Sequence, residues 1–309
     1  MPMHIRLGTR GSKLAMWQAE RVQHLLQSAG HTVPICEIKT VGDQVQDRPL
    51  YAMGGTGVFT KALDDALLQG SVDIAVHSFK DYPTRFPRGI ALAAVPERDT
   101  PLDVFVSPQD ARPDDYLRMG ATVATSSIRR RGQWLARYAH HHMVDVRGNV
   151  QTRLRKLREN GWQGMIMAAA GLSRMGYHEL LNHKLDWMLP APAQGALMVA
   201  CRDRDRPLKD VLAVIHDTNI GIQTKIEREF LNKLEGGCSA PIGALATIRR
   251  EQVHFRGNIC MPDGSRRVQV ALTATHREVH DLARMAVDEA LRKGGDEIMD
   301  YIRTHGHGV

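Results

Sequence analysis

Cys238 lies in the stretch LEGGCSAPIG at 234–243, directly after two glycines and three residues before a proline. Glycine tolerates positive φ and lets the backbone pass close to a ligand, so this loop can aim the sulfur into a cleft. A thiol among arginines is a good nucleophile or attachment point, because nearby positive charge favours the thiolate. The alternative is a cysteine that only packs in a turn. Cys36 and Cys201 stand in strand-like runs, where a role as a small buried hydrophobic residue is typical.

Arginines recur where strands are expected to end and helices to begin. They are Arg10, Arg129, Arg130, Arg131, Arg147, Arg153 and Arg174. In open α/β sheets, ligands bind beyond the carboxyl ends of the strands, and helix N-termini there present N–H groups to anions. The arginine fork matches a carboxylate through two hydrogen bonds. We therefore predict a pocket for a polyanion. A solvated basic surface is one alternative, and a nucleic-acid surface is another, although few aromatic side chains are available to stack on bases.

The segment HSFKDYPT at 77–84 ends a strand-like run, which puts Lys80 and Asp81 at the expected ligand edge of the sheet. An aspartate there can stabilise a developing cation or move a proton. The alternative is a turn aspartate before Tyr82 and Pro83. A metal site is not predicted: three adjacent histidines, 140–142, cannot readily share one tetrahedral ion, and no cysteine or carboxylate is suitably spaced.

Composition is that of a soluble globular protein, with 309 residues, 43% hydrophobic residues and a net charge of +7. The longest apolar run, at 165–172, is far shorter than the roughly 20 residues that span a bilayer. The first residues carry charges without a preceding apolar segment, so neither a signal peptide nor a membrane anchor is expected. The sequence therefore predicts a cytoplasmic protein. The four cysteines are widely scattered, and no disulfide framework is expected.

Two alternations of strand and helix signals position these residues. Strand-like runs fall at 5–9, 33–38, 72–78, 90–95, 122–126, 143–147, 164–170 and 196–202. Helical spacing falls between them at 11–30, 58–70, 127–138, 149–160 and, further on, 220–234. This order is typical of mainly parallel sheets covered by helices. The polar, glycine-rich segment 41–57 is too long for a plain turn and is a candidate functional loop.

Three domains are expected. The first is an α/β domain of residues 1–97 together with about 196–215, because the run at 196–202 can return to the first sheet. The chain crosses to a second α/β domain, 101–190, in the region of 97–105. Three strand-like runs and a helix near 277–293 predict a small α+β domain at 218–309, which carries the Cys238 loop.

Taken together, these segments resemble the porphobilinogen deaminase family. The matching stretches are GTRGSKLAMWQA, GVFTKALDDALL, DIAVHSFKDYPT, ATSSIRRRGQ, VRGNVQTRLRKL, AAAGLSRMG, PAQGALMVACR and EREFLNKLEGGCSAPIG, in the family's order. The resemblance implies two α/β domains like those of periplasmic binding proteins, a small third domain and a monomer. It implies a transferase of tetrapyrrole and haem biosynthesis that joins four porphobilinogen molecules, with loss of ammonia, into hydroxymethylbilane.

The resemblance also implies roles for single residues. Cys238 matches the cysteine that carries a dipyrromethane cofactor through a thioether, and Asp81 matches the catalytic aspartate. Residues implied to hold cofactor carboxylates are Lys80, Ser127, Arg129, Arg130 and Arg153. Residues implied to hold the substrate or the growing chain are Arg10, Ser12, Arg147 and Arg174, and Phe59 is implied to pack on a pyrrole ring. Neither a nucleic-acid partner nor a membrane partner is implied.

The chain departs from the family pattern at Ala52 and Thr56, where many bacterial members have lysines. Any carboxylate contact made by those lysines is lost here or moves to a neighbour such as Lys61. The rival interpretation is a non-catalytic anion-binding protein of the periplasmic-binding-protein fold, which would need neither Cys238 nor Asp81. A nucleic-acid binder would rest on charge alone.

Overall fold

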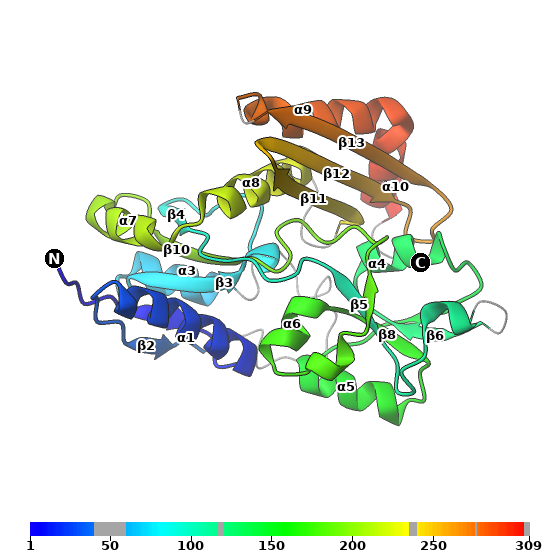
Figure 1. Cartoon of the computed structure of the whole chain (residues 1–309), viewed down its shortest axis with the longest axis horizontal. Helices are drawn as coiled ribbons and strands as arrows, with labels where there is room; N and C mark the ends of the chain where they lie inside the picture. Colours follow the sequence, from blue (N-terminus) through cyan, green and yellow to red (C-terminus); the bar gives the residue numbers. More distant parts are fainter. Residues whose placement is uncertain (40–59, 117–119, 235–239, 276, 306–309) are drawn as a thin grey trace. The chain divides into compact units, whose positions relative to one another are not determined.

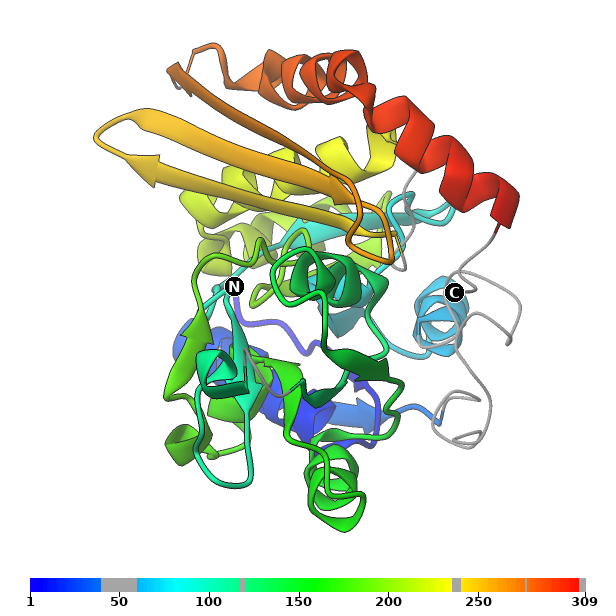
Figure 2. The same ribbon diagram turned by 90° about the vertical axis from the view of Figure 1, so that its right-hand side faces the viewer.

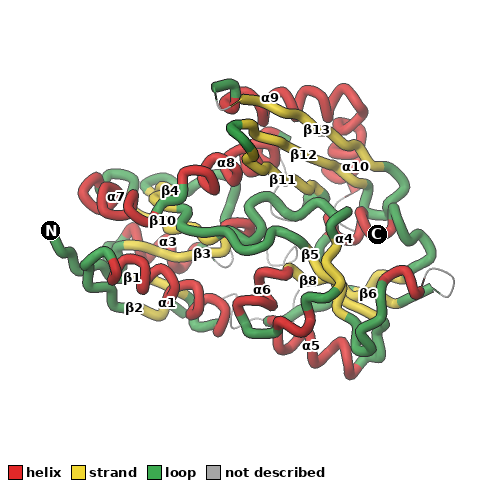
Figure 3. The backbone as a smooth tube through the Cα atoms, in the orientation of Figure 1, coloured by secondary structure: helices red, strands yellow, loops and turns green. Residues whose placement is uncertain are grey.

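The computed structural model describes residues 1–39, 60–116, 120–234, 240–275 and 277–305. The chain divides into two compact units, residues 1–99 with 195–222, and residues 100–194 with 223–309. It therefore passes between units after Asp99, Gln194 and Ile222. Each unit is described separately below, and Figures 1 and 3 label the elements.

The described strands of the first unit form a mixed sheet in the order β2-β1-β3-β10-β4. These strands are β1 (Leu7–Thr9), β2 (Ile35–Glu37), β3 (Ile74–Ser78), β4 (Ile90–Ala94) and β10 (Leu197–Arg202). β1 pairs in parallel with both β2 and β3, whereas β10 is antiparallel to its neighbours β3 and β4. The run at 196–202 thus joins the first sheet, as its sequence predicts.

Alternating residues of this sheet pack against helices on its two faces. Leu7 and Val76 share a core with α1 (Lys13–Ser28) and α7 (Arg206–Leu212). Gly8 instead lies close to Leu63 of α3 (Lys61–Leu68), near enough that a β-carbon would crowd that side chain. Burial of both faces explains why these strands read as apolar runs rather than as alternating ones.

The second unit contains a second mixed sheet, with its described strands in the order β7-β6-β8-β5-β9. They are β5 (Asp103–Val106), β6 (Thr122–Ala124), β7 (His142–Val144), β8 (Gly164–Ala168) and β9 (His183–Leu185). β6 is parallel to β7 and β8, and β5 is antiparallel to β8 and β9. The core on one face includes residues of α5 (Val150–Glu159) and α6 (Ala169–Arg174), and the core on the other includes Trp134 of α4 (Ile128–Leu135).

A third, antiparallel sheet completes this unit. Its described strands are β11 (Ile242–Arg249), β12 (Gln252–Cys260) and β13 (Arg267–Thr275). The helices α9 (Val279–Ala290) and α10 (Asp296–His305) run along it (Figure 2). Phe230 of α8 (Thr218–Lys233) packs edge-on against Phe255 of β12, with 5.1 Å between ring centroids. Buried and exposed residues alternate along β13, as expected when one face of a sheet meets solvent.

The predicted α/β class with a small C-terminal α+β part is confirmed, and the sheets are mixed in the way given above. The three-domain division stays a prediction, since the contacts group residues 100–194 with 223–309. Two predicted elements need correction. β5 is a strand inside the segment interpreted as a crossing, and the strand expected to reach residue 170 ends at Ala168, where α6 follows directly. Among the described helices, none has the length and apolar character needed to cross a lipid bilayer.

Candidate functional site

In the first unit, the predicted site residues gather at one edge of the sheet. Arg10 and Ser12 follow β1, and Lys80 and Asp81 lie in the short helix η2 (Phe79–Asp81), which follows β3. β1 and β3 are parallel neighbours, so their carboxyl ends meet at the same edge. Ser12 caps α1 by accepting a hydrogen bond from the Ala15 amide. The Asp81 side chain is exposed and that of Lys80 is half-buried, so both remain accessible at this edge.

Buried side chains anchor the segment that carries Asp81. Tyr82 is fully buried, and its hydroxyl donates a 2.8 Å hydrogen bond to Oδ1 of Asp64 on α3. Burial raises the pKa of Asp64 to about 6, although the hydrogen bond from Tyr82 opposes the shift. The His77 ring meets that of Tyr82 edge-on, with 4.9 Å between centroids. Burial and the charge of Arg10 lower the pKa of His77 to about 3, so this ring is neutral at physiological pH.

In the second unit, six predicted site residues follow three neighbouring strands. The residues are Ser127, Arg129, Arg130, Arg147, Arg153 and Arg174. β7, β6 and β8 are adjacent and parallel, so their carboxyl ends share one edge. α4 begins after β6, α5 after β7 and α6 after β8, and these helices carry the arginines or follow them directly. This is the geometry expected for anion binding at helix starts.

Local hydrogen bonds fix the starts of two of these helices. The Ser127 hydroxyl caps α4 by accepting from the Arg130 amide. Arg147 stands before Gly148, whose φ of 113° favours glycine. Asn149 then caps α5 by accepting from the Thr152 amide, and the Arg153 side chain turns back to donate from Nε to the Gly148 carbonyl at 2.8 Å. Arg174, at the end of α6, is buried.

Arg129 and Arg130 are buried around one carboxylate that the sequence did not reveal. Asp103, the first residue of β5, is fully buried. Its Oδ2 accepts from Arg129 at 2.8 Å, and its Oδ1 accepts from Arg130 at 2.8 and 3.1 Å. Burial alone would raise the pKa of Asp103, but both guanidinium groups together hold it well below its usual range. Asp103 is therefore ionised over the whole physiological pH range.

Among the described residues, the charges of this cluster do not balance. Two guanidinium groups, 4% and 6% exposed, surround the single carboxylate of Asp103. Burial and then the charge of Arg130 lower the pKa of Arg129, against the opposing pull of Asp103. A buried positive charge is costly unless it is paired, so a surplus here favours the binding of an anion. The donor set fits the carboxylates of a polyanionic ligand.

The structure describes three of the four cysteines. Cys201 and Cys260 are fully buried, and burial raises the pKa of both, that of Cys260 to about 12. These two thiols are therefore held in the unreactive protonated form. Cys36 is partly buried. Cys238 and Phe59 lie outside the described residues, as do Ala52 and Thr56 and the candidate functional loop 41–57. Lys61, the suggested substitute for a missing lysine, is exposed and forms an ion pair with Asp65 at 2.7 Å.

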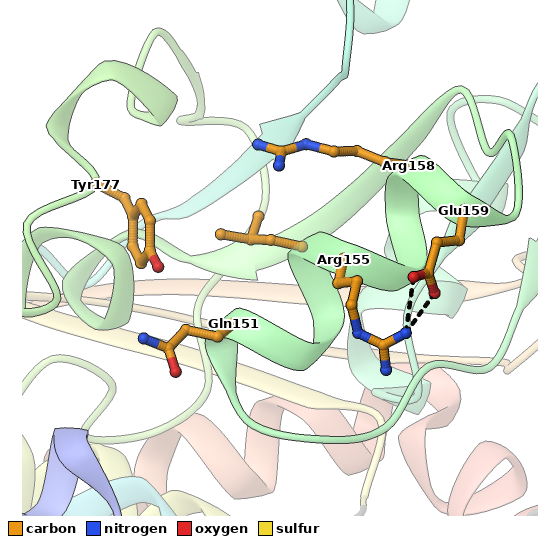
Figure 4. A pocket seen from close by; sticks show the side chains of 6 residues that line it. Gln151, Arg155, Arg158, Glu159 and Tyr177 are labelled. Carbon is orange, nitrogen blue, oxygen red and sulfur yellow. Dashed lines mark hydrogen bonds and ion pairs between the residues drawn. The ribbon is translucent and has the colours of Figure 1, made fainter.

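A shallow pocket of about 340 Å³ lies beside α5 and has a different lining (Figure 4). Leu154 and Tyr177 provide apolar surface there, and Arg155 donates to both oxygens of Glu159 at 2.8 and 2.6 Å. None of the predicted site residues that the structure describes lines this pocket. His141 packs against Trp134 while His140 and His142 are exposed, and no set of three potential ligands is clustered for a metal ion among the described residues.

Comparison with known families decides the assignment. Residues 5–210 match the model of the porphobilinogen deaminase dipyromethane cofactor binding domain, and residues 222–291 match that of the porphobilinogen deaminase C-terminal domain. The chain belongs to the porphobilinogen deaminase family. It is a transferase of tetrapyrrole biosynthesis with the family's dipyrromethane-binding domain.

Full-length relatives agree with this assignment. The porphobilinogen deaminase of Syntrophotalea carbinolica is 39% identical over 299 residues, which are 96% of this chain and 95% of that protein. The porphobilinogen deaminase of Trichlorobacter lovleyi is 38% identical over 312 residues, 99% of each chain. Solved structures with a weaker likeness include the methionine binding protein MetQ, with a TM-score of 0.44, 12% identity and coverage of 71% of this chain and 92% of that chain. The Bordetella pertussis BvgS periplasmic VFT2 domain has a TM-score of 0.42, 14% identity and coverage of 69% and 86%.

Sequence reasoning missed the groups that hold the site residues. Asp103 stands in a four-residue strand within the predicted crossing, and Asp64 reads as an ordinary helix position. A usable signal was present in Tyr82, which follows Asp81: when a tyrosine is buried, its hydroxyl usually finds a hydrogen-bond partner.

Proposed function

We propose that the chain joins four porphobilinogen molecules into hydroxymethylbilane on a dipyrromethane that is bound through a thioether to Cys238. The surplus of buried positive charge at Arg129, Arg130 and Asp103 carries this proposal, because a dipyrrole with acetate and propionate groups supplies the missing negative charge. When bound, the cofactor supplies the pyrrole carbon to which the first substrate is joined.

The predicted site residues at the sheet edge of the second unit divide into two groups. Ser127, Arg129, Arg130 and Arg153 bind cofactor carboxylates, together with Lys80 of the first unit. Arg147 and Arg174 bind carboxylates of the incoming or growing chain, together with Arg10 and Ser12. In support, the guanidinium groups of Arg129 and Arg130 already stand in fixed orientations, which suits a ligand that stays bound through many turnovers.

Asp81 acts on the substrate. Its carboxylate oxygens accept hydrogen bonds from pyrrole N–H groups and offset the positive charge that develops as ammonia leaves. A group that meets charge chiefly in the transition state raises kcat rather than affinity. Support comes from the exposed Asp81 side chain and the buried Tyr82 that anchors its segment. Phe59 packs on a pyrrole ring in this proposal.

Replacement of Cys238 by serine tests the attachment. The intact mass of the purified native chain should exceed the sequence mass by two pyrrole units, and Cys238→Ser should lose this excess and all activity, because serine is a far poorer nucleophile at neutral pH. Cys36→Ala is the matched control and should keep the excess. Covalent pyrrole on the Cys238→Ser chain would refute the proposal.

The proposal includes a cytoplasmic, monomeric enzyme without a nucleic-acid partner. The monomer is tested by the molar mass in solution at several concentrations. Binding of the full chain to a single-stranded oligonucleotide at physiological salt should be absent, and measurable binding would count against this part.

A further inference from the structure

We propose that Asp103 and Gln194 are positioning residues: Asp103 holds Arg129 and Arg130 as one rigid pair, and Gln194 fastens that pair to the chain segments that connect the two units. This inference rests on the proposed function, in which the two arginines bind cofactor carboxylates. It concerns residues that touch the arginines rather than the ligand.

Asp103 is the centre of the arrangement. Its Oδ1 accepts from Nε and Nη2 of Arg130 and from Nε2 of Gln194, the last at 2.9 Å, and its Oδ2 accepts from Nη1 of Arg129. Both carboxylate oxygens are thus occupied by donors from the described residues. A planar guanidinium that shares two hydrogen bonds with one oxygen, as Arg130 does, has little freedom to rotate.

Backbone carbonyls hold the other side of each guanidinium. Arg129 Nη1 donates to the Leu189 carbonyl at 2.8 Å, and Arg130 Nη1 donates to the Ile166 carbonyl of β8 at 3.1 Å. The pair is therefore oriented by β5, by β8 and by the segment that leads out of the unit. These contacts use only some of the N–H groups of each guanidinium. The remaining N–H groups can therefore meet a ligand in a fixed geometry.

Gln194 joins this cluster to the connections between the units. It is 1% exposed, and its amide donates to the Pro101 carbonyl at 2.7 Å and to Asp103. The first passage between the units lies just before Pro101, and the second directly after Gln194. The side-chain amide of Gln194 thus links the first and second passages between the units to Asp103, the carboxylate that orients the arginines.

Ala193, next to Gln194 in the chain, connects this cluster to the third passage between the units. The Ala193 amide, in a backbone with φ of 60°, donates to Glu227 Oε2 at 2.7 Å. Glu227 is fully buried in α8, the helix that contains the third passage. Its Oε1 accepts from the Ala246 amide of β11 at 2.8 Å. A shift of the backbone at 193–194 must therefore change the surroundings of Asp103 and with them the orientation of the arginines.

A purely structural role makes a different prediction. If Gln194 only stabilises the fold, any glutamine amide that holds backbone segments of the same unit together should be equivalent. Gln163 provides this comparison: it is half-buried just before β8, its Oε1 accepts from the Thr122 amide at 2.8 Å, and its Nε2 donates to the Gly161 carbonyl at 3.2 Å. No hydrogen bond of Gln163 in the described residues reaches Asp103 or either arginine.

The test compares Gln194→Ala with Gln163→Ala in the full chain. The readouts are the melting temperature and, by intact mass, the rate at which cofactor-free chain acquires covalent pyrrole from porphobilinogen. Both variants should melt earlier than the native chain. Only Gln194→Ala should load more slowly, by roughly tenfold, the factor that corresponds to the loss of one hydrogen bond to a charged group. Equal loading rates in the two variants would overturn the inference.

Asp103→Glu adds a second measurement, because it keeps the charge but moves the carboxylate by one methylene. If Asp103 is only a counter-ion, Asp103→Glu should load at the native rate. If Asp103 positions the arginines, Asp103→Glu should load more slowly. Normal loading of Asp103→Glu would therefore also overturn the inference. The loading rate of Arg129→Leu distinguishes failure of this inference from failure of the proposed function. If Arg129→Leu itself loads at the native rate, the placement of the arginines on the cofactor is wrong, and the inference falls with it.

Discussion

The two sheet edges hold their charged residues in opposite ways. In the first unit, Asp81 is exposed, and its segment is held by buried groups that form a hydrogen bond rather than an ion pair: His77 is neutral, and Tyr82 donates to Asp64, whose pKa burial raises to about 6. In the second unit, the charges of Arg129, Arg130 and Asp103 are themselves buried and paired. At the first edge an accessible carboxylate lies on a segment that buried side chains hold in place. At the second edge the charged groups themselves are buried and fixed in orientation.

We infer from this difference that Asp81 takes part in the reaction, whereas Arg129 and Arg130 retain the cofactor. An exposed carboxylate can accept hydrogen bonds from a sequence of substrates, and within the described part of the chain no ion pair of Asp81 has to break before it meets each new pyrrole. A buried, surplus-positive cluster favours one anion that binds once and stays. Loss of charge at Asp81 should therefore lower kcat, whereas loss of charge at Arg129 or Arg130 should reduce cofactor loading.

Within the comparison of the two edges, the largest expected effect is that of Asp81→Asn, which keeps the shape of the side chain and removes its charge. If Asp81 offsets a transition-state cation, kcat should fall by about 10² to 10³ while KM changes little. Steady-state kinetics of the cofactor-loaded variant provides the measurement. A near-normal kcat would make Asp81 a turn residue and would end the contrast between the two edges.

A smaller effect separates the arginines of the second edge from one another. Arg129→Leu should yield mostly cofactor-free chain, while Arg174→Leu should keep the cofactor and accumulate chains with one to three added units. Each loss should exceed about tenfold, since a charge-assisted hydrogen bond contributes about 1.5–3 kcal/mol. The measurement is the series of masses after brief exposure to porphobilinogen.

Arg129→Leu is also expected to fold, because it leaves Asp103 paired with Arg130 in a balanced cluster. Arg129→Lys should restore loading only in part, since lysine lacks the planar fork. Identical mass series for Arg129→Leu and Arg174→Leu would show that the second edge is one site without division of roles.

The smallest effect is the pH dependence of stability that Asp64 contributes. The folded-state pKa of Asp64 is raised to about 6, above its ordinary value of 3.8, so the folded state binds the proton more tightly. Its contribution is present below about pH 4 and is lost as pH rises through about 6. The melting temperature of Asp64→Asn relative to the native chain should therefore rise between pH 4 and 7.

His77 has the opposite sign, because its lowered pKa costs stability as pH falls from 6.5 towards about 3. His77 is present in both proteins, so the difference between their melting curves reports on Asp64. Asp65→Asn removes an exposed carboxylate from the same helix and serves as the control. A pH-independent difference for Asp64→Asn would mean that this buried carboxylate does not titrate in the folded protein.

The sequence predicted the α/β alternation and the strand ends that carry the arginines, because apolar runs and helical periodicity are local signals. It could not predict Asp103. A four-residue strand that begins with a carboxylate gives no periodic signal, and its neutralising partner Arg129 lies 26 residues away in the sequence. Arg129 and Arg130 therefore looked available only to a ligand, although Asp103 already binds both. The roles of Cys238 and Phe59 stay predictions, since both lie outside the described residues.

The place of β10 has a consequence for the order of assembly during synthesis. β10 lies between β3 and β4, so the first sheet cannot close before residues 197–202 have been made. The described strands of the second sheet come from residues 103–185, and this sheet can be complete earlier. During synthesis we therefore expect the β3 edge that β10 covers to stay open until residue 202 has been made, so that the second sheet can form first, against the usual N-to-C order. Chaperones that protect nascent chains should meet this protein chiefly through its first hundred residues.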